Sequence, residues 1–201
     1  MPESEQPGDP SWLRIALGEL GTAEDLDPGE SNPQVLKYLQ STTVGHDLSH
    51  DDQTDWCSAF VNWCIEQSHN EGTNSAAARS WVNWGKPTND PARGCVVVFS
   101  RGPSHGHVGF YLRRRPGMIT VLGGNQGHKV TVADQDDSRL LGYRLGPEED
   151  DVTKEELEQV IDTKLSPGFD KAFDWANQLN EVRQNVEAIK RDVAEIKSRQ
   201  T

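Results

Sequence analysis

The chain has 201 residues, which suffices for one domain of ordinary size with a buried core and an appended segment, and its 34% of hydrophobic residues is low for a single compact globule. Its 20 Lys and Arg against 32 Asp and Glu give a formal net charge of −12, which argues against nucleic acid as the main partner because phosphate binding needs a basic face. The sequence has no apolar run of about 18 residues, so no membrane-spanning helix is expected.

The first ten residues are rich in Pro and acidic residues, which predicts a disordered leader. They have neither the basic start nor the apolar stretch of a signal peptide. We therefore expect synthesis in the cytoplasm, and a separate carrier for any target outside the cell.

Two helices are expected early in the chain. Ser11 can cap a helix that starts at Trp12 and stops at Gly21, with apolar residues at helical spacing. A second helix is expected over 33–41. Polar loops follow both segments.

The strongest helical pattern of the first half follows a polar loop that ends at Thr54 or Asp55, either of which can act as the cap. The helix expected over 56–66 is apolar on most sides and should be buried. A further short helix is expected over 76–84.

From Gly94 onward the pattern changes to short β-branched runs that alternate with Gly- and Pro-rich turns. Strands are expected over 95–99, 108–112, 119–122, 129–132 and 140–144. A run of helices followed by a run of short strands indicates an α+β fold, with helices packed on a meandering antiparallel sheet.

The acidic run 147–151 marks the expected domain boundary, so residues 11–146 form one domain and residues 147–201 an acidic linker with C-terminal helices. Apolar residues repeat in an a/d heptad pattern over 179–196: Leu179, Val182, Val186, Ile189, Val193 and Ile196. This pattern predicts a coiled coil that makes the protein a homo-oligomer. The alternative is an amphipathic helix packed against its own domain.

Cys57 is the first candidate for chemistry. It falls in the first turn of the buried helix, where free N–H groups and the helix dipole favour a thiolate, the nucleophilic form of cysteine. Cys64 lies about 10 Å further along the same helix, too far for a disulfide, and it is assigned to packing together with Cys95.

A thiolate nucleophile needs a base, and the base needs an orienting group. His107 adjoins an expected strand that can hold it rigidly, so it is the preferred base, with His105 as an accessory or second choice. Asn125 follows two glycines that suggest a close backbone approach, and its amide could accept a hydrogen bond from the imidazole. The alternative for His105 and His107 is a polar lead-in to the strand, and the alternative for Asn125 is an ordinary turn.

Five stretches together resemble a bacterial and phage family of papain-like cell-wall hydrolases, related to the CHAP amidohydrolase/peptidases and the NlpC-type peptidases. In chain order they are DWCSAFVNWC at 55–64, AAARSW at 76–81, VVFS at 97–100, HVGFY at 107–111 and LGGNQ at 122–126. The resemblance covers roughly residues 11–145. It implies a papain-like fold with Cys57 as nucleophile, His107 as general base and Asn125 as orienting residue.

The chain also departs from this family pattern. Many CHAP relatives carry a carboxylate two residues ahead of an Asn, where this chain has Gly123, so Asn125 is preferred and Gln126 is the alternative. The usual glutamine before the cysteine is replaced by Asp55 and Trp56, which are expected near the site as substrate-binding or accessory residues.

The resemblance implies a thiol-dependent amide hydrolase whose substrate is the peptide part of peptidoglycan, cleaved by amidase or endopeptidase action. The net charge of −12 favours delivery to the cell wall by a phage or a secretion system, with a delivery or inhibitor partner. No cofactor is expected, and no metal, because tight Cys-x-x-Cys or His-x-x-x-His pairs are missing. The alternative from a different class is a non-catalytic papain-like scaffold that oligomerises through its coiled coil.

Overall fold

The computed structural model describes residues 3–27, 29–43, 51–52, 54–146 and 182–186. The chain divides into two compact units, Met1–Glu149 and Asp150–Thr201. The expected coiled coil over 179–196 lies outside the described residues, apart from 182–186, which are helical and exposed. Within the described ranges no helix is both long and apolar enough to cross a bilayer.

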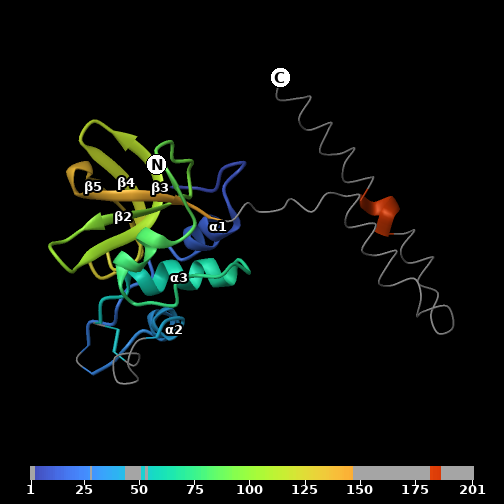
Figure 1. The fold of residues 1–201 in the computed structure, drawn as a ribbon. Helices are drawn as coiled ribbons and strands as arrows, with labels where there is room; N and C mark the ends of the chain where they lie inside the picture. The colour runs from blue at the N-terminus through green and yellow to red at the C-terminus, as the bar shows by residue number, and fades with distance from the viewer. Residues whose placement is uncertain (1–2, 28, 44–50, 53, 147–181, 187–201) are drawn as a thin grey trace. The chain divides into compact units, whose positions relative to one another are not determined.

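Three α-helices precede the sheet: α1 (Ser11–Gly18), α2 (Pro33–Gln40) and α3 (Cys57–Gln67). Helix α3 contacts the sheet, and α2 packs on α3 on the side away from the sheet, as Figure 1 shows. Helix α1 contacts both α3 and strand β4. The early helices therefore form a layer on one face of the sheet.

The capping residues of α1 and α3 differ from those predicted. The N-cap of α1 is Pro10 and not Ser11, and α1 ends at Gly18, before the expected stop. The N-cap of α3 is Trp56, whose side chain makes no capping hydrogen bond. Neither Thr54 nor Asp55 caps α3, because burial of the apolar helix decides where it begins. Helix α2 follows the local rule, since Asn32 accepts a hydrogen bond from the Gln34 N–H at 2.8 Å.

The segment expected as a short helix over 76–84 is a 3₁₀ helix, η2 (Ala78–Asn83). Six strands follow it, and another short 3₁₀ helix, η3, stands before the last strand. Their bounds are β1 (Lys86–Thr88), β2 (Val96–Ser100), β3 (Gly106–Arg115), β4 (Met118–Gly123), β5 (Thr131–Asp136), η3 (Asp137–Arg139) and β6 (Leu140–Leu145). The short edge strand β1 was not predicted.

The sheet is antiparallel, with the order β1-β6-β2-β3-β4-β5. Strands β2 to β5 form the expected meander, but β6 returns to pair with β2 instead of β5. This return covers the edge of β2, which would otherwise leave backbone groups of buried residues unpaired. The α+β class is therefore confirmed, and the simple meander is corrected.

The core lies mainly between the helices and the sheet. Helix α3 contributes a nearly continuous buried surface that packs on the inner side chains of β2, β3 and β4. A smaller cluster occupies the other face of the sheet and consists of Val97, Phe99, Ile119, Val121 and Tyr143.

The N-terminal segment expected as a leader is anchored where the structure describes it. Arg93 pairs with Glu3 at 2.6 Å and with Asp9 at 2.8 Å, and it also donates to the Ser4 carbonyl at 3.0 Å. The Asp9 side chain is only 2% exposed. The charges of this segment therefore hold residues 3–10 against the domain.

Candidate active site

Cys57 is the first residue of α3 and is 7% exposed. Its sulfur makes a hydrogen bond with the backbone of Val108, the residue next to His107 in β3. The fold therefore brings the start of the buried helix to the start of the strand that carries the histidine. These segments are 50 residues apart in sequence, and only packing joins them.

Burial raises the pKa of the Cys57 thiol. The hydrogen bond with Val108 and the positive charge of Arg101 act in the opposite direction but are outweighed. The sequence predicts a lowered pKa from the helix dipole, and that prediction is wrong. Desolvation wins because the sulfur is covered by the sheet as well as by its own helix.

His107 is fully buried in β3. Its Nε2 lies 3.1 Å from Oε1 of Gln126, which lies in the loop between β4 and β5. Its Nδ1 has no hydrogen-bond partner among the described residues, and no hydrogen bond joins it to Cys57 in this structure. One imidazole nitrogen is thus held by Gln126, and the other has no partner among the described residues.

The surroundings of Gln126 fix the orientation of its amide. Its Nε2 donates to the carbonyl oxygens of Thr131 at 2.6 Å and Gly123 at 3.3 Å. Carbonyl oxygens only accept, so Oε1 must face His107. Oε1 also accepts a hydrogen bond from Nε2 of Gln135 in β5 at 2.9 Å.

This amide orientation sets the tautomer of His107. Because Gln126 offers an oxygen, His107 Nε2 carries the proton, and Nδ1 of the neutral ring keeps its lone pair. Burial, and next the charge of Arg101, lower the pKa of His107 to about 4 against the opposing effect of the Gln126 hydrogen bond. The imidazole is therefore neutral near pH 7, with Nδ1 as its basic nitrogen.

Asn125 does not contact His107 by a hydrogen bond. Its Nδ2 donates to Oδ1 of Asp55 at 3.2 Å, and both residues are at the surface of this region. Asn125 has a φ of +52°, which turns the chain so that the next side chain, Gln126, points back to the sheet. The predicted contact between Asn125 and the imidazole is therefore corrected to Gln126, the alternative.

The other accessory candidates are placed as follows. Trp56 is fully buried and donates from Nε1 to Glu24 at 2.8 Å. The same carboxylate lies 2.7 Å from Nδ1 of His128, whose side chain is exposed. His105 is exposed and contacts Ser104 at 3.1 Å. Asp55 and Trp56 therefore directly precede Cys57, whereas the His105 side chain makes no hydrogen bond with Cys57 or His107.

The two glycines before Asn125 provide the close approach predicted from the sequence. A side chain at Gly124 would overlap Trp56, with an added Cβ 2.5 Å from its ring, and would also overlap Phe60. A Cβ at Gly123 would stand 3.5 Å from Nε2 of His107. The loop after β4 can therefore lie directly on the start of α3.

Sequence reasoning missed Gln135 and Arg101. Gln135 lies in a polar part of β5 with no motif around it, and only the strand pairing brings it to Gln126. Arg101 follows β2, and its charge acts on both Cys57 and His107. A cationic residue just after a central strand is too common for the sequence to indicate that Arg101 acts on Cys57 and His107.

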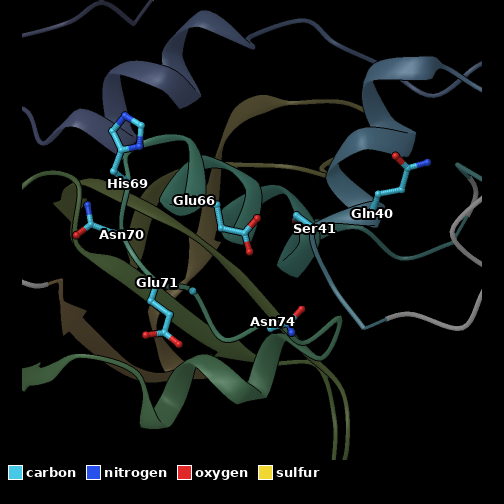
Figure 2. Close-up of a pocket in the computed structure, with 8 residues that line it drawn as sticks. Gln40, Ser41, Glu66, His69, Asn70, Glu71 and Asn74 are labelled. Atoms are coloured by element: carbon cyan, nitrogen blue, oxygen red, sulfur yellow. The ribbon is translucent and has the colours of Figure 1, made fainter.

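A polar cavity of about 550 Å³ lies at the opposite end of α3 from Cys57 (Figure 2). Glu66, His69, Glu71 and Asn74 are among its lining residues. Glu66 is nine residues beyond Cys57, about 14 Å along the helix. This cavity is therefore separate from the candidate active site.

Comparison with known families gives one result that bears on this geometry. Residues 49–125 match the CHAP domain family. The CHAP match confirms the resemblance expected from the sequence, and the helices with their six-stranded antiparallel sheet are compatible with it. It includes Cys57 and His107 and ends at Asn125, one residue before Gln126. No curated protein matches the chain.

The CHAP match indicates a hydrolase of the amidase or peptidase type with peptidoglycan as its substrate and the cell wall as its place of action. It does not itself assign the residues that carry the reaction.

Proposed function

We propose that the protein is a cysteine hydrolase that cleaves an amide bond in the peptide part of peptidoglycan, with Cys57 as nucleophile, His107 as general base and Gln126 as the orienting residue. The observation that carries this proposal is the contact of His107 Nε2 with Gln126 Oε1 at 3.1 Å, from which the tautomer follows. Gln126 accepts from the protonated Nε2, which leaves Nδ1 as the basic nitrogen of a buried imidazole, and Cys57 begins the helix that contacts the same strand, β3.

The first half of the reaction forms a thioester. His107 Nδ1 takes the proton of the Cys57 thiol as the sulfur attacks the amide carbonyl carbon. The imidazolium then carries a proton on both nitrogens, and Oε1 of Gln126 accepts from the one on Nε2. Nδ1 returns its proton to the departing amine as the C–N bond breaks.

The second half releases the product. A water molecule loses a proton to Nδ1 and attacks the thioester carbonyl. The C–S bond breaks, a carboxylic acid leaves, and the proton returns to the Cys57 sulfur. His107 therefore alternates between base and acid while Nε2 keeps its proton throughout.

The raised thiol pKa and the lowered imidazole pKa mean that the resting pair is neutral. The nucleophile is therefore activated by proton transfer during attack, when the bound substrate supplies a carbonyl carbon to the sulfur. A thiolate–imidazolium pair in the resting enzyme would instead need a lowered pKa of the thiol and a raised pKa of the imidazole.

The test is muropeptide release from purified sacculi, followed by mass spectrometry. The wild type should release soluble fragments, and Cys57→Ala should release none above background. Cys95→Ala is the matched control, because it removes a buried thiol from the start of β2 and should stay active. The masses of the fragments distinguish amidase from endopeptidase cleavage. Equal release by wild type and Cys57→Ala would contradict the proposal and favour a non-catalytic scaffold.

A further inference from the structure

A second cavity lies at the end of β2. Its volume is about 630 Å³, and it is lined by Ser100, Arg101, Gly102, Ser138 and Arg139. The lining holds two guanidinium groups and two hydroxyl groups, and no carboxylate. This is notable in a chain of net charge −12, where a surface chosen at random would be acidic.

The strand register places this cavity close to His107. Phe99 in β2 pairs with His107 on one side and with Leu140 on the other, and Arg139 directly precedes Leu140. Two strand spacings amount to about 10 Å. An extended peptide rises about 3.3 Å per residue, so this is the length of roughly three substrate residues.

The nearby acidic residues are engaged elsewhere. Asp137 pairs with Arg114 at 2.8 Å, and Asp136 accepts a hydrogen bond from the Ser138 N–H at 2.9 Å. The Arg139 charge acts on Asp136, but neither acidic residue lines the cavity. Within the described part of the chain, neither Arg101 nor Arg139 has a side-chain hydrogen bond or ion pair.

The loop that carries Arg101 is held in place by hydrogen bonds from Arg79. Arg79 donates to the Gly102 carbonyl at 2.7 Å, to Ser100 Oγ at 3.0 Å and to the His105 carbonyl at 3.1 Å. These three bonds tie the 100–105 loop to η2. A loop that is already ordered loses little entropy when a ligand binds.

We propose that this cavity is a substrate subsite in which Arg101 and Arg139 bind a free carboxylate of the peptide, two or three residues from the bond that is cleaved. A guanidinium group presents paired N–H donors that match the two oxygens of a carboxylate. The inference rests on the proposed function, since it names the peptide as the ligand. It adds that the protein selects peptides by a negative charge near the scissile bond.

The test compares soluble peptides released from peptidoglycan with derivatives in which each free carboxylate is converted to a carboxamide, one at a time. For the wild type, one derivative should be cleaved with a kcat/KM lower by about 10- to 100-fold, mainly through KM, because a charge-assisted hydrogen bond is lost. Arg139→Gln should lower kcat/KM for the parent peptide by a similar factor. This variant should also cleave the parent and that derivative within about twofold of each other.

Arg139 is the better site for the variant, because the charge of Arg101 also acts on Cys57 and His107. Arg115→Gln is the matched control. It also removes one positive charge, but at the end of β3 far from His107, so it should preserve the preference for the parent peptide over the carboxamide. Equal cleavage of all derivatives by the wild type would overturn the subsite. So would full discrimination in Arg139→Gln.

A binding measurement separates this inference from the proposed function. Calorimetry with Cys57→Ala and the same peptides should show tighter binding of the parent than of the one carboxamide, and no such difference when Arg139→Gln is added. If the wild type cleaves none of the peptides, the proposed hydrolase function fails, and this binding difference alone decides whether the carboxylate subsite exists.

Discussion

His107 Nε2 and Gln126 Oε1 lie 3.1 Å apart in the interior of the domain, and the amide nitrogen of Gln126 is committed to backbone carbonyls on its other side. The contact therefore has a fixed direction, with the imidazole donating and the amide accepting. In the proposed mechanism this direction makes Nδ1 the nitrogen that accepts the thiol proton.

Gln126→Met should lower kcat/KM by between about 10² and 10⁴-fold, because the side chain of similar length removes the acceptor that selects the tautomer. Nitrogen NMR of the imidazole should show Nε2 protonated and Nδ1 unprotonated in the wild type, and a mixture of both forms in the variant. Asn125→Gly is the matched control and should leave the tautomer unchanged, since Asn125 contacts Asp55 instead and glycine keeps the left-handed turn. The same spectrum in wild type and Gln126→Met would refute this role.

Gln135→Leu should reduce kcat by about 2- to 10-fold with little change in KM, because Gln135 acts only through Oε1 of Gln126. The residue is a positioning residue and touches neither Cys57 nor His107 by a hydrogen bond. Gln135→Glu offers an acceptor where a donor is needed, so it should be worse than Gln135→Leu. An effect on KM alone would contradict this assignment.

The pH profile of kcat/KM should be broad. His107 loses its base function as pH falls through about 4, because protonated Nδ1 cannot accept the thiol proton. The thiol stays protonated until the pH exceeds the ordinary range for cysteine, since burial raises its pKa. Activity should therefore persist from about pH 5 to about pH 9.

The state of the sulfur can be measured directly. Ultraviolet difference spectra between wild type and Cys57→Ala should show no thiolate at pH 6 to 7, and alkylation of Cys57 should be slow there. A strong thiolate signal at that pH would mean that a stored ion pair exists and that the neutral resting pair is incorrect.

Gly124→Ala should destabilise the domain by about 1–3 kcal/mol, because the added Cβ would stand 2.5 Å from the Trp56 ring and 2.6 Å from Phe60 Cβ. Urea unfolding followed by fluorescence gives the free energy of unfolding. Gly18→Ala is the control, since a Cβ at the end of α1 meets nothing within 4 Å and should be neutral or stabilising by up to about 1 kcal/mol. A similar effect of both substitutions would contradict the packing argument.

Arg93→Met should cost about 3 kcal/mol of stability, because it leaves the carboxylate of Asp9, 2% exposed, without its partner. Limited proteolysis should then cut the first ten residues faster. Arg115→Met provides the comparison, since its pair with Asp134 is half exposed at 3.8 Å and should contribute less than about 1 kcal/mol. An Arg93→Met variant as stable as Arg115→Met would show that the N-terminal segment is not anchored by charge.

Local patterns were enough to predict most of the helices and strands and to select the candidate residues of the site. The helical spacing of apolar residues located α2 and α3, the β-branched runs located β2, β3, β4 and β6, and the paired glycines indicated a close approach. Cys57 and His107 were selected because one starts a buried helix and the other adjoins a strand. Each of these inferences needs only neighbours within a few residues.

Only the tertiary structure decided how those residues act. Asn125 and Gln126 are adjacent in sequence and chemically alike, and a left-handed turn at Asn125 determines which amide reaches the imidazole. The helix dipole predicted an acidic thiol, yet burial by the sheet reverses the shift. Desolvation and hydrogen-bond direction depend on atoms brought together from distant segments, so they follow from packing and not from any local pattern of residues.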